Sequence, residues 1–276
     1  MVSRHQIKKA VKVLELACSE NFKDVKNELQ FALTATKNYL KRSDKEYSML
    51  SRDAGSATTS VYNFDDDFFN KWNHEHPLEV KRFIRNWISK QSDWKYPMVF
   101  LQPTHLRYCH MGIKSSLVYI LSQKYSKEQI LEEIKKSLEK NADPKQFRFK
   151  PLEHHGDIPD MQVPHEQIGN IITLDYFPYL TIQQIDSFMF SFNRLLRPGG
   201  NAFIHFADAD GEKEWQAVTN KKITYMTQEI FSKICDKFSF KVEYYTIADF
   251  YTFAYIIKPG KLKSNKKGPT KMEKIV

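Results

Sequence analysis

Cysteine and long apolar runs are scarce in this sequence, and each shortage excludes a class of protein. The 276 residues include only 3 cysteines, far apart, which indicates neither a disulfide framework nor a zinc ribbon. No apolar run approaches the ~20 residues that span a bilayer. The first ten residues carry His5, Lys8 and Lys9 where a signal sequence would be apolar. We therefore expect a soluble protein without membrane contact, located in the cytoplasm, or in the host cytoplasm if the source is a virus.

Motifs for hydrolysis and for metal binding are missing as well. The chain contains no HExxH, no paired CxxC and no nucleophile elbow. Its 9 histidines form only loose clusters, and none of these clusters places three ligands on one face of an element, so we expect no metal site. The clusters are His74 with His76, His105 with Cys109 and His110, and His154 with His155.

Composition is typical of a folded, basic protein. Hydrophobic residues make up 41%, charged residues 27% and aromatic residues 14% of the chain. Most of the net charge of +9 is concentrated after Tyr255, where the sequence has seven lysines and a single acid, Glu273. This basic tail has two interpretations: a solvated segment, or a segment that contacts nucleic acid.

Apolar periodicity divides the chain into three parts. Residues 1–92 predict a helical extension, with helical spacing over 5–42, a loop over 43–63 and a helix near 78–89. Residues 93–260 alternate between strands and helices and predict an α/β domain; residues 261–276 are the basic tail. The expected strands are 98–101, 117–121, 168–174, 201–206, 241–247 and 252–257, and the expected helices are 127–140, 182–196 and 227–238. Such alternation predicts a mainly parallel sheet covered on both faces, closed by an antiparallel C-terminal pair.

A distinctive joint lies at residues 193–206, NRLLRPGGNAFIHF. Pro198 is predicted to end a helix, Gly199 and Gly200 to supply positive φ, and the residues that follow to form a buried strand. The pattern resembles the turn before the fifth strand of class I S-adenosylmethionine-dependent methyltransferases. Together with the strand order over 96–258, it implies a Rossmann-like, seven-stranded sheet. The C-terminal half, including IIKPGKL, is similar to methyltransferase-like proteins often encoded by bacteriophages.

The resemblance implies a binding site for S-adenosylmethionine, from which this chain departs at two places. The family has a glycine-rich loop after the first strand, where this chain has Gln102 and Thr104. The family has a ribose-binding acid at the end of the second strand, where this chain has Ser122 and Gln123. Side chains in the first loop extend into the space that glycine leaves open for a cofactor.

Two further parts of the resemblance concern the adenine and the methyl group. Gly156 and Asp157 resemble the region in which Asp157 would accept from the adenine amine, although the same residues are ordinary turn formers. Leu174, Asp175, Tyr176 and Phe177 would lie beside the transferred methyl group, with Tyr176 or Phe177 facing the sulfonium. The alternative is that the two aromatic residues belong to the core, with Asp175 at the strand end.

Two hypotheses of function follow. The first is methyl transfer from S-adenosylmethionine to an unidentified acceptor, contacted by residues at the carboxyl edge of the sheet: Asp175, Tyr176, Asp208 and Asp210. Asp208 and Asp210 also suit an ordinary polar loop. The alternative is a degenerate, non-catalytic methyltransferase fold kept as a binding or structural module, viral or not, because the glycine loop and the ribose-binding acid are missing.

Overall fold

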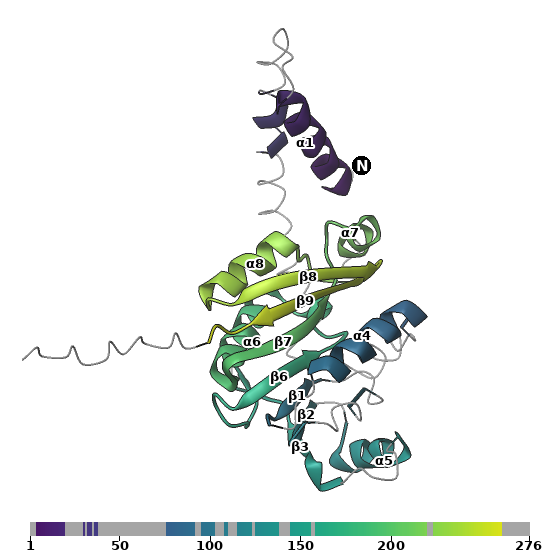
Figure 1. Ribbon diagram of the computed structural model, residues 1–276. Helices are drawn as coiled ribbons and strands as arrows, with labels where there is room; N and C mark the ends of the chain where they lie inside the picture. Colours follow the sequence, from purple (N-terminus) through teal and green to yellow (C-terminus); the bar gives the residue numbers. More distant parts are fainter. Residues whose placement is uncertain are drawn as a thin grey trace, which may run out of the picture.

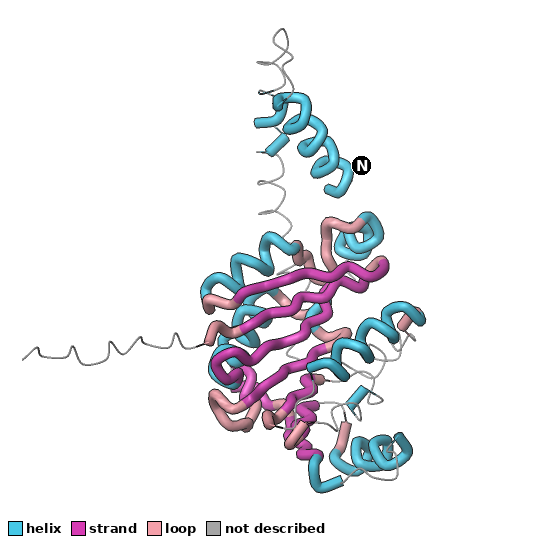
Figure 2. Tube along the Cα trace, viewed as in Figure 1, coloured by secondary structure: helices cyan, strands magenta, loops and turns pink. Residues whose placement is uncertain are grey.

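A computed structural model describes the chain in segments. These are residues 4–19, 30, 32–34, 36–37, 76–91, 95–102, 108–109, 115–122, 125–137, 144–155, 158–219 and 223–260. The predicted loop at 43–63 and the basic tail lie outside them. The main body is a seven-stranded sheet with helices on both faces (Figures 1 and 2). No helix in these segments combines the length and apolar character needed to cross a bilayer.

The sheet confirms the predicted class, a mainly parallel sheet with an antiparallel C-terminal pair. Its order is β3-β2-β1-β6-β7-β9-β8. The strands are β1 Met98–Leu101, β2 Val118–Ser122, β3 Phe147–Pro151, β6 Ile168–Thr173, β7 Leu196–Phe206, β8 Lys241–Ala248 and β9 Tyr251–Ile257. Strand β1 pairs in parallel with both β2 and β6, whereas β9 runs antiparallel to β7 and β8. The strand order therefore reverses between β1 and β6, which is where α/β sheets of this kind bind ligands.

Amphipathic helices cover the two faces of the sheet: α4 Leu78–Gln91 and α5 Lys127–Ser137 on one, α6 Ile182–Leu195 and α8 Gln228–Lys237 on the other. The helices α1 Arg4–Ser19 and α7 Glu212–Thr219 contact each other away from these faces (Figure 1). In α4, Val80, Ile84 and Ile88 recur every fourth residue and are fully buried against one face. Helices α6 and α8 pack on the opposite face, together with the short helix η3 Phe177–Tyr179. Helix α4 thus belongs to the core of the sheet domain.

One strand and one hairpin were not predicted from the sequence. Strand β3, with the sequence FRFKP, is the outer strand of the sheet and is largely accessible to solvent. Arg148 and Lys150 interrupt its apolar pattern, as is common in edge strands, so no apolar run marks it. The hairpin of β4 Glu153–His155 and β5 Ile158–Asp160 is too short and too polar to leave a signal.

The joint between α6 and β7 differs in detail from its prediction. The helix ends at Leu195, before Pro198, and β7 already begins at Leu196. Gly199 has a φ of 75°, but the prediction of positive φ was wrong for Gly200. A Cβ atom at Gly200 would lie 2.9 Å from the carbonyl oxygens of both Arg197 and Ile168. Glycine is required there because two backbone segments approach closely.

Lys258 fastens this joint to the end of β9. Its amide donates to the Gly200 carbonyl and its own carbonyl accepts from the Gly199 amide, both at 2.9 Å. Its ammonium group donates to the carbonyls of Asn193 at 2.6 Å and Leu196 at 2.8 Å. These carbonyls belong to the end of α6, where helical partners run out.

We expect Gly200→Ala to lower the free energy of unfolding by about 1–3 kcal/mol, because the added methyl group is forced against backbone atoms. Urea denaturation measures the change. Gly199→Asn is the matched control: a Cβ atom at Gly199 would lie 3.7 Å from its nearest neighbour, an atom of the Arg197 side chain, and asparagine tolerates left-handed backbone. A Gly200→Ala protein as stable as wild type would contradict the close-approach explanation.

Candidate functional site

The carboxyl ends of β6 and β7 bring an aspartate and a histidine together. Asp175 follows β6 in a left-handed conformation, with a φ of 55°. His205 lies near the end of the adjacent strand β7. The amide of Asp175 donates to Nδ1 of His205 at 3.0 Å. The turn after β6 is therefore held against β7 by the side chain that it faces.

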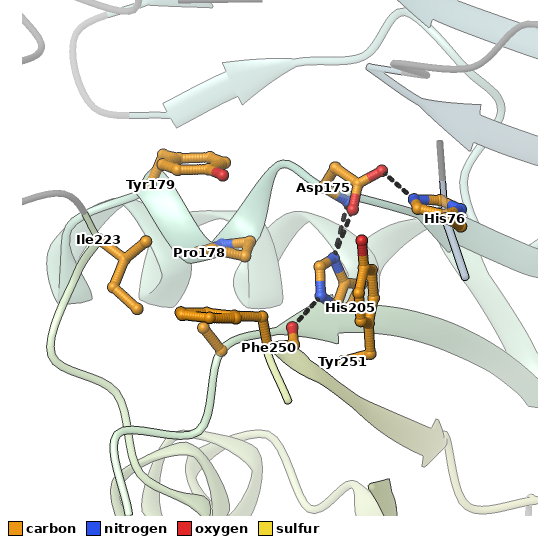
Figure 3. A pocket seen from close by; sticks show the side chains of 9 residues that line it. His76, Asp175, Pro178, Tyr179, His205, Ile223, Phe250 and Tyr251 are labelled. Atoms are coloured by element: carbon orange, nitrogen blue, oxygen red, sulfur yellow. Dashed lines mark hydrogen bonds and ion pairs between the residues drawn. The ribbon is translucent and has the colours of Figure 1, made fainter. Parts of the chain in front are cut away.

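A second histidine completes a buried cluster around the Asp175 carboxylate (Figure 3). Oδ1 lies 2.9 Å from Nδ1 of His205, and Oδ2 lies 2.7 Å from Nε2 of His76, just before α4. The side chains of His76, Asp175 and His205 are only 2%, 12% and 6% exposed. We call these three residues the His-Asp-His cluster. It joins segments that are distant in the sequence.

The outer nitrogens of the two histidines are also engaged. Nδ1 of His76 lies 3.0 Å from the hydroxyl of Tyr108, and the two rings stack. Nε2 of His205 donates to the carbonyl oxygen of Phe250 at 2.7 Å, and its ring stacks on Tyr251. Each ring is therefore fixed in orientation.

The cluster keeps its carboxylate charged. Burial on its own would raise the pKa of Asp175, but hydrogen bonds from His205 and His76, together with their charges, hold that pKa well below its usual range. Asp175 is therefore ionised at neutral pH. A buried carboxylate of this kind is tolerated only because it is hydrogen-bonded on both oxygens.

Both ring nitrogens of His205 are engaged within the protein. A carbonyl oxygen only accepts, so Nε2 carries the hydrogen that bonds to Phe250. Nδ1 lies 3.0 Å from the amide nitrogen and 2.9 Å from Oδ1 of Asp175. The ring therefore fixes the position of the Asp175 carboxylate.

An aromatic pocket of about 230 Å³ opens beside the cluster. Its lining consists of His76, Asp175, Pro178, Tyr179, His205, Ala207, Ile223, Phe250 and Tyr251. Figure 3 shows the rings of Tyr179 and Phe250 on opposite sides of Pro178, with the carboxylate at one end. Burial and the charge of Asp175 raise the pKa of Tyr251 to about 12 and also raise that of Tyr179. Both hydroxyls are therefore protonated donors at neutral pH.

Of the residues predicted to contact an acceptor, only Asp175 lines this pocket. Tyr176 is 1% exposed and packs edge-on against Phe188, in the position of a core aromatic. Asp208 follows β7, and its Oδ2 accepts from the side chain of Gln228 at 2.8 Å. Burial first, and then the charge of Asp210, raise the pKa of Asp208.

Asp210 pairs with Lys8 of α1. The predicted acidic loop therefore lies next to the pocket, where Ala207 is the lining residue, and Asp210 connects it to α1.

Two predicted cofactor residues lie at the strand ends near the switch point. Gln102 follows β1 with a φ of 45°, so glutamine adopts the left-handed turn for which a glycine was expected. Ser122 ends β2, and its hydroxyl accepts from the amide of Tyr125 at 3.1 Å. Leu174 is buried in the core. The remaining residues predicted to bind cofactor lie outside the described segments: Thr104, Gln123, Gly156 and Asp157.

These positions fit the methionine and sulfonium part of S-adenosylmethionine better than they fit its ribose. The left-handed backbone at Gln102 preserves the main-chain turn, and Asp175 supplies an anionic group for a sulfonium. At the ribose end the hydroxyl of Ser122, 2% exposed, replaces a carboxylate. Within the described residues no group of three histidine, cysteine or acidic side chains is arranged to hold a metal ion.

Sequence reasoning missed most of the pocket. His76 was considered only as a metal ligand, and His205 was not singled out, although it is a polar residue within a run of apolar ones. A polar residue inside an apolar strand could therefore have been singled out from the sequence as a candidate site residue. Tyr179, Phe250 and Tyr251 carry no comparable signal, because aromatic residues in such positions are usually core residues.

No protein-family model matches this chain, and no curated protein matches it. Solved structures do match. A putative O-methyltransferase from Nostoc punctiforme PCC 73102 is similar with a TM-score of 0.52 and 8% identity, over 77% of this chain and 68% of that protein. The S-adenosylmethionine-dependent methyltransferase SibL, in its apo form, is similar with a TM-score of 0.51 and 11% identity, over 74% of this chain and 62% of SibL. This chain thus matches a little under two thirds of SibL.

These similarities show the fold. The chain has the fold of class I S-adenosylmethionine-dependent methyltransferases, as the resemblance of its joint and strand order implied. Neither similarity bears on the likeness to phage-encoded proteins. At identities this low, the shared fold does not transfer a substrate from one protein to another.

The lowered pKa of Asp175 predicts how the stability of the folded protein depends on pH. Its charged form stabilises the folded state above the ordinary aspartate pKa of about 3.9, and this contribution is lost as pH falls through the lower, folded pKa. We therefore expect Asp175→Asn to be less stable than wild type near neutral pH and the gap to narrow below about pH 4. Urea denaturation at a series of pH values measures it.

Asp208→Asn is the control, because its pKa is shifted in the opposite direction. A raised pKa means that the charged form destabilises the folded state. The stability of wild type relative to this variant should therefore fall as pH rises from about 4. The same pH trend in both variants would contradict the assignment of Asp175 as the stabilising charge.

Proposed function

We propose that this protein transfers a methyl group from S-adenosylmethionine to an acceptor bound in the aromatic pocket. One observation carries the proposal: an ionised Asp175, held by His76 and His205, lies at the carboxyl edge of a class I methyltransferase sheet, beside its switch point. Ligands of open α/β sheets bind at this edge. The similar structures support the fold on which the argument rests.

The residues that would hold the cofactor lie around the ends of β1, β2 and β6. Leu101 of β1 pairs with Thr173 of the neighbouring strand β6. The turns at Gln102 and Asp175 therefore begin at nearly the same height along the sheet. We assign the methionine end to the main chain at Gln102 and the sulfonium to the side of Asp175. When bound, S-adenosylmethionine supplies an electrophilic methyl group.

The chain itself would position the acceptor and the sulfonium beside the Asp175 carboxylate. His205 is a positioning residue, because its Nδ1 lies 2.9 Å from Oδ1 of that carboxylate. His76 is a positioning residue, because its Nε2 hydrogen holds the other carboxylate oxygen. Pro178 and Ile223 would supply an apolar wall on the side away from the carboxylate (Figure 3).

A non-catalytic module is the second candidate, and one observation favours it. The hydroxyl of Ser122 already accepts a hydrogen bond from the backbone amide of Tyr125, at the place where the family has a ribose-binding acid. Without that acid, affinity for the ribose is reduced. This candidate requires that the folded protein does not bind S-adenosylmethionine.

Calorimetric titration of the full chain separates the two candidates. We expect S-adenosylmethionine and its demethylated product to bind with dissociation constants in the micromolar range. Asp157→Ala should weaken binding about tenfold or more, because a hydrogen bond to a charged group is lost. Gln102→Gly should retain binding, since its backbone is already left-handed. Absence of heat at millimolar ligand, with a cooperative unfolding transition intact, would establish the non-catalytic candidate.

A further inference from the structure

We infer that the amino edge of the sheet, opposite the pocket, binds a single strand of nucleic acid. The phosphates would contact cations at this edge, and the bases would stack on aromatic side chains beside α4. The inference does not depend on methyl transfer. It is carried by the separation of charge between the two edges of the sheet, by the exposed aromatic side chains, and by the place where the basic tail begins.

Cationic side chains lie along the amino edge, where β1, β6, β7 and β8 begin and β9 ends. Lys95 precedes β1, Arg197 is the second residue of β7, and Lys241 is the first residue of β8. Lys90 lies at the same edge, because the carbonyl oxygen of the next residue, Gln91, accepts a hydrogen bond from β6 at 2.8 Å. Within the described part of the chain, Lys90, Arg197 and Lys241 take part in no ion pair. Their charges are therefore available to an external anion.

The carboxyl edge has the opposite charge. Asp175 is ionised there, and two lysines near this edge are already paired with acids. Lys8 pairs with Asp210, and Lys213 pairs with Asp249 at 2.5 Å. A polyanion is therefore attracted to the amino edge and repelled from the edge that carries the pocket.

Partly exposed aromatic side chains connect α4 with the β8–β9 pair. We call Phe83, Trp87, Tyr245 and Tyr255 the aromatic strip. The ring centroids of Phe83 and Tyr245 are 5.7 Å apart, and those of Trp87 and Tyr255 are 5.5 Å apart. Trp87 stacks on Phe203 of β7 at 4.2 Å with an angle of 14° between the rings, so its other face points away from the sheet. Such ring faces are the surfaces on which unpaired bases stack.

The cation at Arg197 is held in a fixed position. Its guanidinium carbon lies 3.6 Å from the centroid of the Tyr96 ring, and its Nη1 donates to the carbonyl oxygen of Pro198 at 3.0 Å. A planar guanidinium fixed in this way loses little rotational freedom when it contacts a phosphate. Arg197 is therefore suited to contact the nucleic-acid backbone near the middle of the edge.

The basic tail begins at the same edge. Strand β9 runs antiparallel to β7, so its last residue, Ile257, lies at the amino edge, and Lys258 is bonded there to Gly199 and Gly200. The sequence over 261–276 adds six lysines. The largest concentration of positive charge in the sequence therefore joins the domain at the edge that is already cationic.

The arrangement favours a single strand over a duplex. From β1 to β8 the edge crosses four strand-to-strand steps, or about 19 Å at about 4.8 Å for each step, which is enough to contact several successive phosphates. In a duplex the bases are paired and stacked on one another, so the aromatic strip would add nothing to the affinity.

The test is fluorescence anisotropy of the full chain with a labelled oligothymidylate of about 20 nucleotides. We expect a micromolar dissociation constant at about 50 mM salt, and the logarithm of the affinity should fall linearly with that of the salt concentration, with a slope of about −2 to −4. A duplex of the same length should bind at least about fivefold more weakly, because it cannot use the aromatic strip.

The double variant Lys90→Gln, Lys241→Gln tests the cations. We expect affinity to fall about tenfold at low salt and the salt slope to become shallower by about 1.4, because each phosphate contact of a single strand contributes about 0.7. The matched control is Lys127→Gln, Lys150→Gln, which changes the net charge equally at the start of α5 and near the end of β3. It should leave affinity and slope unchanged.

The variant Tyr245→Thr tests the aromatic strip. Tyr245 is 37% exposed, and threonine suits a strand, so we expect the urea unfolding midpoint to change little. Affinity should fall about fivefold with the salt slope unchanged, because a stacking surface is lost and a charge is not. Phe190→Ala, which removes an aromatic side chain 41% exposed on α6, should leave affinity unchanged.

Four results would overturn the inference. These are no binding of the oligothymidylate, wild-type affinity and slope in the Lys90→Gln, Lys241→Gln protein, an equal loss in its matched control, and a duplex bound as tightly as the single strand. Wild-type behaviour of the double variant would assign all binding to other charges, such as those of the tail. Binding to phosphatidylserine vesicles without binding to the oligonucleotide would assign the amino edge to a membrane surface instead.

Discussion

The buried charge of Asp175 is the constraint on which the carboxyl edge of this sheet depends. A carboxylate in such a position is costly unless both oxygens are hydrogen-bonded. Its partners come from the segment before α4 and from β7, so one side chain ties the N-terminal part of the domain to the middle of the sheet. Because it contacts this carboxylate, the ring of His205 is held in one orientation, and its Nε2 bonds to the carbonyl oxygen of Phe250 in the turn between β8 and β9. That turn carries the pocket residues Phe250 and Tyr251.

Much of the fold could be predicted from the sequence, and most of the site could not. Buried strands such as Met98–Leu101 and the joint at Pro198 leave strong local patterns, because apolar period and turn chemistry act over a few residues. Strand β3 was missed because Arg148 and Lys150 hide an edge strand. The cluster depends on contacts over long sequence separations, such as that of His76 with Asp175. Asp175 could be named as a candidate site residue because the end of a strand is recognisable from local sequence. Its partners, His76 and His205, could be identified only from the tertiary structure.

Backbone strain is concentrated at this edge of the molecule. Among the described residues other than glycine, positive φ occurs at Gln102, Gln162, Glu166, Asp175, Ser239 and Phe250. Three of these six residues, Gln102, Asp175 and Phe250, lie at the carboxyl edge. Residues with side chains occupy turns that glycine would adopt without cost. A sequence search for glycine motifs overlooks such a site, although the main chain follows the same path.

The fastening at Lys258 lies far from the pocket. Strand β9 begins at Tyr251, beside the pocket, and ends at Ile257, which pairs with Asn201 of β7. At about 3.4 Å for each residue, this strand carries the chain about 20 Å from the pocket before Lys258 fastens it. One end of β9 therefore borders the pocket while the other holds the turn between α6 and β7, so a change at Lys258 acts on the pocket only through the strand between them.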